Sequence, residues 1–217
     1  MTAFGGFPEE TISFLANLKK NNRKDWFDAN RAVYQSAVKL PAEIFCEAMV
    51  DELRKLTGEN YRSRIFRIHR DLRFSKDKSP YNTHLHISFL PNGENPPAWL
   101  FGLEPGRLSL GCGCFDLAKG QLERFRERIA AAEGDVLVQA LTGLSKKGYR
   151  TSDPELKKPP VPFPADHRRA DLLRRKSLTV FREYSDVKSV LGPGAVATCL
   201  RHYKELRPIF DWLGDLG

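Results

Sequence analysis

The sequence has few cysteines and none in the spacing of a metal-binding ribbon. The four are Cys46, Cys112, Cys114 and Cys199, and no two of them form a CxxC pair. A chain of 217 residues is also long for a small secreted domain held together by disulfides. We therefore expect reduced, mostly buried thiols rather than a disulfide framework or a zinc ribbon.

The sequence also lacks a membrane-spanning or export segment. No apolar run approaches the roughly 20 residues that a transmembrane helix needs. The opening residues, MTAFGGFPEE, have neither the basic region nor the apolar stretch that begins a signal peptide. These absences predict a cytoplasmic protein that does not bind membranes.

Motifs of the common enzyme classes are missing too. The chain contains no GxSxG, no P-loop, no GxGxxG and no HExxH. No catalytic residue, metal or cofactor is therefore predicted, and the motifs leave open whether the protein is an enzyme. The sequence contains no internal repeats and does not indicate an oligomeric state.

What the sequence does have is enough apolar residues for a core and a strongly positive charge. Hydrophobic residues make up 41% of it, which at this length favours a single domain over residues 1–217. The net charge is +8, and residues 54–78 and 146–183 carry nine and eleven Lys/Arg against three and five Asp/Glu. Clustered positive charge attracts phosphates and nucleic acid, although a solvated basic surface would have the same composition.

Hydrophobic periodicity predicts a helical N-terminal part over residues 1–58. Pro8 and the two acidic residues after it suit a helix start, and this first helix ends near Asn22. A second helix starts near Asn22 and runs to Val38, and a third runs from Pro41 to Gly58.

After residue 60 the pattern becomes that of strands separated by turns. The predicted strands of this strand-rich core, residues 60–115, are Ile65–Phe74, Leu85–Leu90, Ala98–Leu103 and Arg107–Cys112. Short turns between consecutive strands predict antiparallel pairing.

The remaining residues, 116–217, read as helices plus one further strand. Helices are expected over 117–132, 136–144, 169–174 and 194–212, with Pro208 kinking or dividing the last, and a strand over Leu178–Tyr184. The proline-rich residues 152–166 predict a loop. The fold class is thus α+β, a mainly antiparallel sheet packed against N-terminal, middle and C-terminal helices.

The segment RIFRIHRDLRFSKDKSPYNTH, residues 64–84, mixes charges with apolar side chains in alternation. As a strand, Ile65–Phe74 places Phe66, Ile68, Leu72 and Phe74 on one face and Arg67, His69, Asp71 and Arg73 on the other. Arg70 then falls on the apolar face, which predicts a buried ion pair or a bulge there.

A basic site at the end of this strand is the candidate for function. Arg side chains bind phosphate or carboxylate with two parallel hydrogen bonds, Lys adds a mobile charge, and Asp orients the cations. We predict binding of a phosphate-bearing ligand, a nucleotide or nucleic acid, with Tyr81 accessible because Pro80 fixes its turn. The site residues are Arg67, Arg70, Asp71, Arg73, Ser75, Lys76, Asp77, Lys78, Tyr81 and His84. The basic segment Arg168–Lys176 would extend the surface for a longer anion.

Two other interpretations of these residues stay open. The protein could be an enzyme acting on a small phosphorylated or carboxylated substrate. Alternatively, it could be a structural or interaction protein whose Arg/Asp cluster is an internal ion-pair network, with Asn30 and Tyr34 as partners.

Two further groups of residues have a structural and a functional interpretation. Trp26, Phe27, Phe66 and Phe74 could stack nucleic-acid bases, but large aromatics at these positions are more typical of a core. His84 and His86 share one strand face, as do Cys112 and Cys114. Together the four could form a zinc ligand set, although such spacing is not a recognised zinc signature and close packing at the adjacent Gly111 and Gly113 is the simpler interpretation.

Several motifs together resemble a known family. They are KNNRKDWFDANRAVY near the start, RIHRDLRFSKDKSPYNTH in the centre, the helix LERFRERI and the late segment with KKPP, DH and DLLRRKSL. The chain resembles the domain of unknown function 2461 family, conserved hypothetical proteins of bacteria and fungi. The resemblance covers nearly the whole chain and implies a single intracellular domain of about this length, and it implies no activity.

Overall fold

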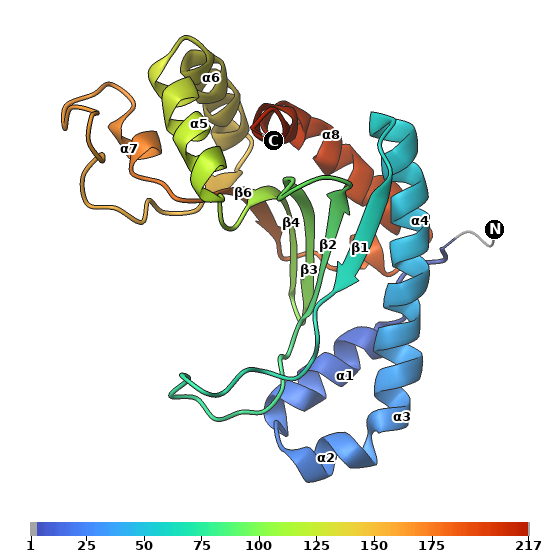
Figure 1. Cartoon of the computed structure of the whole chain (residues 1–217). Helices are drawn as coiled ribbons and strands as arrows, with labels where there is room; N and C mark the ends of the chain where they lie inside the picture. The colour runs from blue at the N-terminus through green and yellow to red at the C-terminus, as the bar shows by residue number, and fades with distance from the viewer. Residues whose placement is uncertain (1–3, 217) are drawn as a thin grey trace. The chain divides into compact units, whose positions relative to one another are not determined.

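The fold is an antiparallel sheet with helices packed against it (Figure 1). The computed structural model describes residues 4–216. The sheet has six strands in the order β1-β2-β3-β4-β6-β5, which confirms the predicted α+β class. The strands are β1 (Tyr61–Ile65), β2 (Leu85–Pro91), β3 (Ala98–Glu104), β4 (Arg107–Cys114), β5 (Arg150–Thr151) and β6 (Leu178–Tyr184).

The helices lie where hydrophobic periodicity placed them, with three differences. The second predicted helix is divided into α2, α3 and the π-helical turn η1, a 3-10 turn η2 was not foreseen, and α8 continues through Pro208. The helices are α1 (Glu9–Lys20), α2 (Lys24–Ala29), α3 (Arg31–Tyr34), η1 (Gln35–Lys39), α4 (Leu40–Thr57), α5 (Lys119–Ala130), α6 (Glu133–Lys146), α7 (Ala170–Leu173), η2 (Lys188–Val190) and α8 (Ala195–Gly214).

The prediction that Pro208 could divide the last helix is wrong, and burial explains why. Proline inside a helix costs about 3 kcal/mol, because it removes one hydrogen bond and crowds the preceding turn. Leu206, Ile209 and Phe210 beside it are all buried, and each large apolar side chain contributes about 1.5–3 kcal/mol when buried. The apolar contacts on both sides of Pro208 therefore outweigh the lost hydrogen bond.

The chain divides into two compact units, each described here by itself. The first unit comprises Met1–Phe89, Leu100–Ser109 and Glu183–Arg201, and the second comprises Leu90–Trp99, Leu110–Arg182 and His202–Gly217. This division does not test the prediction of one domain over residues 1–217, which stays a prediction.

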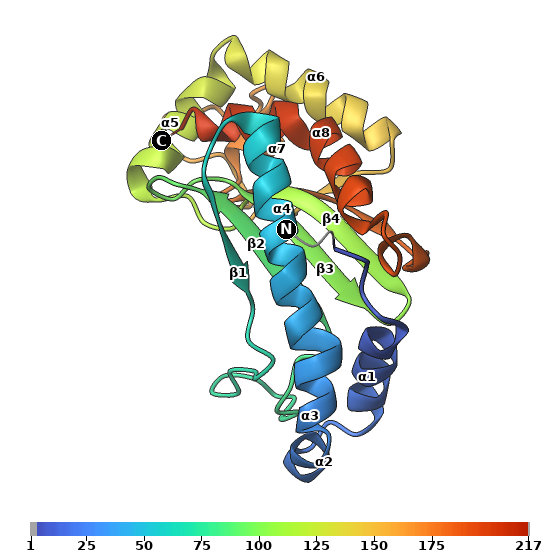
Figure 2. The same cartoon turned by 90° about the vertical axis from the view of Figure 1, so that its right-hand side faces the viewer.

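In the first unit α4 covers one face of the strands. Figure 2 shows α4 crossing β2 and β3, and Phe45 on its inner face packs against Phe89 and Phe101 with ring centroids 6.1 and 4.8 Å away. Gly58 ends α4 as predicted, in the left-handed conformation with φ of 81°. The helix and the sheet thus share one apolar interface.

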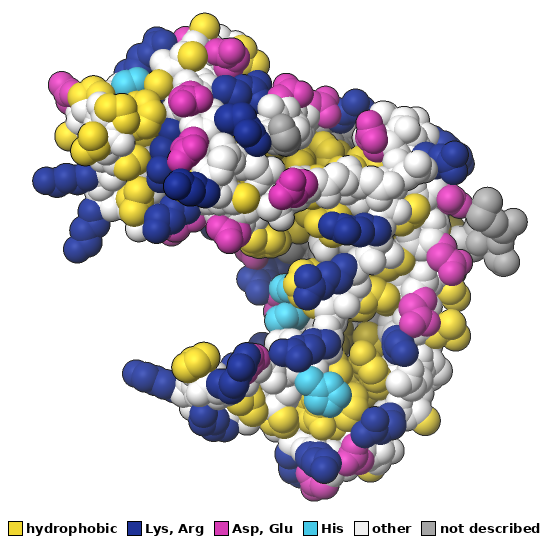
Figure 3. Space-filling view, in the orientation of Figure 1, with side chains coloured by type: hydrophobic (Ala, Val, Ile, Leu, Met, Phe, Trp, Pro, Cys, Tyr) yellow, Lys and Arg dark blue, Asp and Glu magenta, His cyan; other side chains and the backbone are white. Residues whose placement is uncertain are grey.

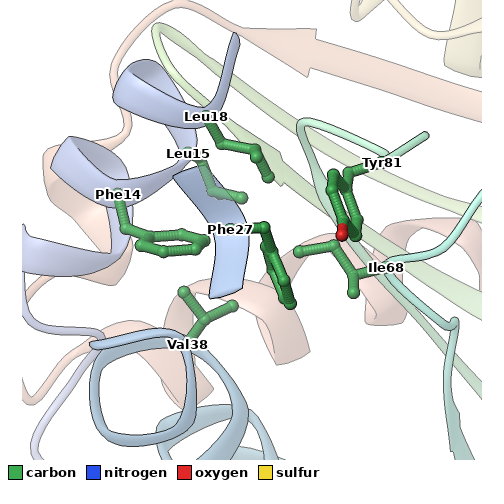
Figure 4. Packing of buried hydrophobic residues seen from close by; sticks show 7 residues of the cluster. All are labelled: Phe14, Leu15, Leu18, Phe27, Val38, Ile68 and Tyr81. Carbon is green, nitrogen blue, oxygen red and sulfur yellow. The ribbon is translucent and has the colours of Figure 1, made fainter. Parts of the chain in front are cut away.

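A second core group of the first unit joins the N-terminal helices to the loop between β1 and β2. Figure 4 shows Phe27 between Phe14 and Tyr81, and Phe27 is only 1% exposed. We call this group the helical cluster; its members are Phe14, Leu15, Leu18, Phe27, Val38, Ile68 and Tyr81. The cluster holds residues of the loop, Ile68 and Tyr81, against α1, α2 and η1.

In the second unit β4 and β6 approach each other unusually closely at Gly113. Its φ of 142° is a conformation that other residues rarely adopt. A Cβ atom at this position would lie 2.1 Å from the carbonyl oxygen of Leu178 and 2.7 Å from Cα of Thr179. The close packing predicted for the glycines beside the cysteines is therefore present.

All four cysteines are free and buried, as predicted. Burial raises the pKa of Cys46 to about 11 and that of Cys114 to about 12. Because the thiolate is the reactive form, these thiols are inert at neutral pH. No helix among residues 4–216 is both long and apolar enough to cross a membrane.

The predicted strand Ile65–Phe74 is wrong: β1 ends at Ile65, and an irregular loop follows it as far as β2. Of the four apolar residues on the predicted strand face, only Ile68 is buried, and it packs in the helical cluster. Phe66 is 40% exposed and Phe74 is 96% exposed, so the interpretation of these two aromatics as core is also wrong.

Candidate functional site

Residues 66–84, the β1–β2 loop, fold back on themselves. Two backbone hydrogen bonds join the outgoing and returning halves, from Arg70 N–H to Pro80 (2.9 Å) and from Asn82 N–H to Ile68 (2.6 Å). His69 and Tyr81 form a single antiparallel bridge between them. The loop is therefore narrow and hairpin-like, and it is visible in Figure 1 between β1 and β2.

The side chain of Asn22 fastens this loop to the N-terminal helices. Its amide Nδ2 donates to the Tyr81 carbonyl at 2.8 Å, and its Oδ1 accepts from the Tyr81 N–H at 3.0 Å. The Tyr81 ring stacks on Phe27 with centroids 4.2 Å apart and is only 4% exposed. The prediction that Tyr81 is accessible is therefore wrong, because the ring is part of the helical cluster.

Arg70 organises the tip of the loop. Its guanidinium donates to Asp77 Oδ2 (2.6 Å), the Ser79 carbonyl (3.0 Å) and Ser75 Oγ (3.2 Å). The Ser79 backbone N–H, the Ser79 side chain and Arg70 together lower the pKa of Asp77 to about 2. The ion pair predicted for Arg70 is present but not buried, because the side chain of Asp77 is 63% exposed.

Three more predicted site residues are also used within the loop. Arg73 donates two hydrogen bonds to the Asp71 carboxylate, from Nε at 3.0 Å and from Nη2 at 2.6 Å. Lys78 donates to the Leu72 carbonyl at 3.0 Å. The hydrogen bonds from Arg73 lower the pKa of Asp71. Part of the charge in this segment therefore stabilises the β1–β2 loop through hydrogen bonds within it.

Asn30 and Tyr34, which were predicted as partners of the arginines in an internal ion-pair network, interact with other residues. Asn30 donates to the Trp26 carbonyl at 2.8 Å, and the Tyr34 ring packs against Phe27 and Phe14. Among the described residues, neither one hydrogen-bonds to the arginines of the loop. The network therefore exists, but it is confined to the loop.

The β1–β2 loop, together with the end of β1 and the start of β2, lines a pocket of about 560 Å³. Figure 3 shows histidine side chains next to Lys and Arg side chains on this part of the surface. We call it the β1–β2 pocket; its lining residues are Arg64, Ile65, Phe66, Arg67, His69, Arg70, Asp71, Asn82, His84 and His86.

The pocket contains four of the ten predicted site residues. These are Arg67, Arg70, Asp71 and His84. The other six, Arg73, Ser75, Lys76, Asp77, Lys78 and Tyr81, do not line it. Conversely, Arg64, His69, Asn82 and His86 line the pocket and were not among the predicted site residues.

Two arginines of the pocket form no close ion pair among the described residues, although the charge of Arg67 helps to lower the pKa of Asp71. Within residues 4–216 no carboxylate lies within 4.0 Å of the guanidinium of Arg64 or Arg67. Arg64 instead lies over the ring of Phe66, with Cζ 5.0 Å from the ring centroid. Both side chains are exposed, so their hydrogen-bond donors are free to meet a ligand.

His84, the last residue of the β1–β2 loop, and His86 of β2 line the pocket side by side. Their rings stack with centroids 3.8 Å apart and an interplanar angle of 25°. Gly102 on β3 makes room for them, because a Cβ there would approach the His86 ring to 3.1 Å. Without that side chain, the His86 ring can lie flat against the neighbouring strand.

The two rings are held in the neutral form. Desolvation by the surrounding protein, and then the like charge of His84, lower the pKa of His86 to about 4. Desolvation is also the main cause that lowers the pKa of His84. Both imidazoles therefore offer a lone pair and one N–H at neutral pH.

This shift predicts how stability depends on pH. The unfolded chain binds a proton at position 86 more readily than the folded chain, so the free energy of unfolding decreases as pH falls below about 6.5 toward 4. We expect the melting temperature of the wild type to fall more between pH 7 and pH 5 than that of His86→Gln. Thermal unfolding at the two pH values measures this difference, and equal losses in both proteins would contradict it.

The structure does not support the suggested zinc ligand set. Among residues 4–216 no three His, Cys, Asp or Glu side chains gather as a metal site would require. Cys112 is fully buried, and its thiol faces the Leu206 carbonyl at 3.9 Å.

Comparison with family models identifies the relatives of this chain. The model of a family described as conserved hypothetical protein (DUF2461) matches residues 10–212. The chain belongs to this family. A comparison with curated proteins found no match.

In this DUF2461 member, the second basic segment is used mostly for structure. Arg168 and the buried Arg169 both pair with Asp135, at 2.8 and 3.2 Å, and Arg174 pairs with Asp171. Arg169 also donates to the Ala130 carbonyl at 3.0 Å. The prediction that Arg168–Lys176 extends an anion-binding surface stays a prediction.

Proposed function

We propose that this protein binds a phosphate-bearing ligand, a nucleotide or nucleic acid, in the β1–β2 pocket. The observation that carries the proposal is that two arginines, Arg64 and Arg67, line one pocket and have no carboxylate within 4.0 Å among the described residues. Guanidinium groups without a partner are ready to form paired hydrogen bonds with phosphate oxygens. Arg70 also lines the pocket but is already committed to the loop.

The remaining walls suit the other parts of a nucleotide. Phe66 is 40% exposed and has Arg64 over its ring, which is an arrangement on which a base can stack. His84 and His86, being neutral, can donate or accept hydrogen bonds with a sugar or a base edge. The pocket thus pairs an aromatic surface with free cations, the combination typical of proteins that bind single strands.

We expect Arg67→Gln to weaken binding of a fluorescein-labelled single-stranded oligonucleotide by about tenfold to a hundredfold, the value of one charge-assisted contact. Fluorescence anisotropy at two salt concentrations measures this. Because bound phosphates release counterions, the wild-type affinity should fall steeply with salt and the variant's less steeply.

The matched control is Arg62→Gln. Arg62 is an exposed arginine of β1, two residues before Arg64, and it does not line the pocket. The substitution removes the same charge, so a general electrostatic attraction would weaken equally in both variants. No binding at low salt, or equal weakening by both substitutions, would reject the proposal for nucleic acid. Titration with a mononucleotide by calorimetry then tests the smaller ligand.

One observation favours an enzyme acting on a small phosphorylated substrate as a second candidate. A neutral imidazole beside unpaired arginines can accept a proton while the arginines hold a phosphate. His84 and His86 both meet this condition. If the protein is an enzyme, it converts a phosphorylated substrate, and His84→Gln or His86→Gln abolishes this turnover. If it is a binding protein, it leaves the bound ligand chemically unchanged.

A further inference from the structure

The second unit contains a pocket of its own, of about 430 Å³. α6, α7 and the paired strands β5 and β6 contribute residues to it, and Thr151 of β5 lies opposite Val180 of β6. Figure 1 shows these elements in the colour range from olive to orange. One wall is apolar, formed by Leu141, Leu144, Leu172 and Val180, and Arg175 belongs to the polar wall.

Arg175 is a buried cation with incomplete hydrogen bonding. Only 6% of the residue is exposed. Its guanidinium donates to the Ser152 carbonyl and, at 3.3 Å, to Thr151 Oγ1. Its Nε is buried and has no hydrogen-bond partner among the described residues.

Arg175 has no ion pair with a carboxylate among the described residues. Within residues 4–216 no carboxylate lies within 4.0 Å of Arg175. The nearby Asp171 pairs with Arg174, and Glu155 accepts hydrogen bonds from the Lys176 N–H and the Ser177 hydroxyl. A buried charge is normally paired, because removing it from water without a partner is unfavourable.

The surroundings of Arg175 also shift the pKa of its guanidinium group. Burial lowers the pKa of Arg175, and Glu155, Asp171 and Asp153 offset this only in part. An anion that entered the pocket would supply the missing counter-charge. The apolar wall would at the same time favour a ligand with a hydrocarbon body over a bare inorganic ion.

We propose that this pocket binds a small carboxylate with an apolar body, a fatty or aromatic acid. The carboxylate pairs with Arg175 and the body lies against Leu141, Leu144, Leu172 and Val180. This site is independent of the β1–β2 pocket, since the residues that line it all belong to the second unit. Its ligand therefore need not carry phosphate.

Isothermal titration calorimetry of the full chain with hexanoate, hexanol and hexylamine tests the proposal. We expect hexanoate to bind about tenfold to a hundredfold more tightly than hexanol, the effect of one charge-assisted hydrogen-bonded pair, and hexylamine not to bind. Equal affinity for hexanoate and hexanol, or no binding of hexanoate, would overturn the proposal.

Two α6 variants locate the binding. Ser145 lines the pocket and is exposed, so Ser145→Phe should fill the pocket and abolish hexanoate binding without disturbing the fold. Lys146→Phe adds the same ring one residue away, outside the pocket, and should bind hexanoate normally. Binding that survives Ser145→Phe would place hexanoate elsewhere and reject the assignment.

Two variants then separate this site from the β1–β2 pocket and test the charge. Arg67→Gln should leave hexanoate binding unchanged, because Arg67 lies in the other pocket. Arg175→Met should remove the preference for hexanoate over hexanol. If Arg175→Met does not fold, the comparison of Ser145→Phe with Lys146→Phe still decides the proposal.

Discussion

Replacing Phe27 by alanine is expected to lower the free energy of unfolding by about 3–5 kcal/mol, the usual cost of removing a fully buried phenylalanine. Phe27 is 1% exposed and stacks on Tyr81 with centroids 4.2 Å apart. The cavity would open between the N-terminal helices and the β1–β2 loop. For a chain of this length the melting temperature should fall by roughly 6–20 °C.

The control for this prediction is Phe74→Ala. It deletes the same side chain from a residue that is 96% exposed, so the melting temperature should change by less than about 2 °C. Differential scanning calorimetry of the two variants beside the wild type measures both shifts. If Phe74→Ala destabilised the protein as much as Phe27→Ala, the loop would be packed differently from the structure described above.

Replacing Gly113 by alanine is expected to cost at least about 4 kcal/mol or to prevent folding, since strain and overlap add at this position. The φ of 142° strains any residue with a side chain. The new Cβ would lie 2.1 Å from the Leu178 carbonyl oxygen, which belongs to the backbone of β6. The overlap is relieved only if β4 and β6 separate, which breaks the hydrogen bonds between them.

Gly106→Ala separates these two contributions. Gly106 has φ of 77°, but a Cβ there would meet nothing within 4 Å, so only the strain of about 1–2 kcal/mol applies. Urea denaturation curves for both variants give the comparison. A Gly113→Ala protein as stable as Gly106→Ala would mean that β4 and β6 do not approach closely at this point.

The helices and strands with strong local signals could be predicted from the sequence. Leu178–Tyr184 was predicted with the bounds of β6, and Gly58 was predicted to end α4. These signals lie within one element, where periodicity and end residues act on the backbone directly. β5 was missed because two residues, Arg150–Thr151, are too few for any periodic pattern.

The β1–β2 loop could not be predicted, because its structure depends on distant partners. Alternation over Ile65–Phe74 suggests a strand, but a strand face is buried only where another layer covers it. Tyr81 is held by Asn22, which is 59 residues away in the sequence, and no local pattern reports that pairing. Proline at position 80 did not indicate that the Tyr81 ring faces the helical cluster.

The candidate site was predicted in part, for the same reason. The misfit of Arg70 on an apolar face suggested a buried ion pair, whereas Arg70 lies outside β1 and pairs with the exposed Asp77. Arg64 and His86 were missed because β1 and β2 bring them together only in the folded sheet. The shared face of His84 and His86 was visible in the sequence, and Gly102 beneath the rings was the signal left unused.

The two hydrogen bonds of Asn22 carry a consequence for how family members diverge. Its amide imitates a peptide group, offering one donor and one acceptor to the same backbone residue, Tyr81. Among short side chains only asparagine supplies both; aspartate loses the donor, serine does not span both positions, and glutamine is one methylene too long. Position 22 should therefore tolerate almost no substitution over evolution wherever this loop is kept, although Asn22 does not line the β1–β2 pocket. A relative with another residue there is expected to have a β1–β2 loop of different length.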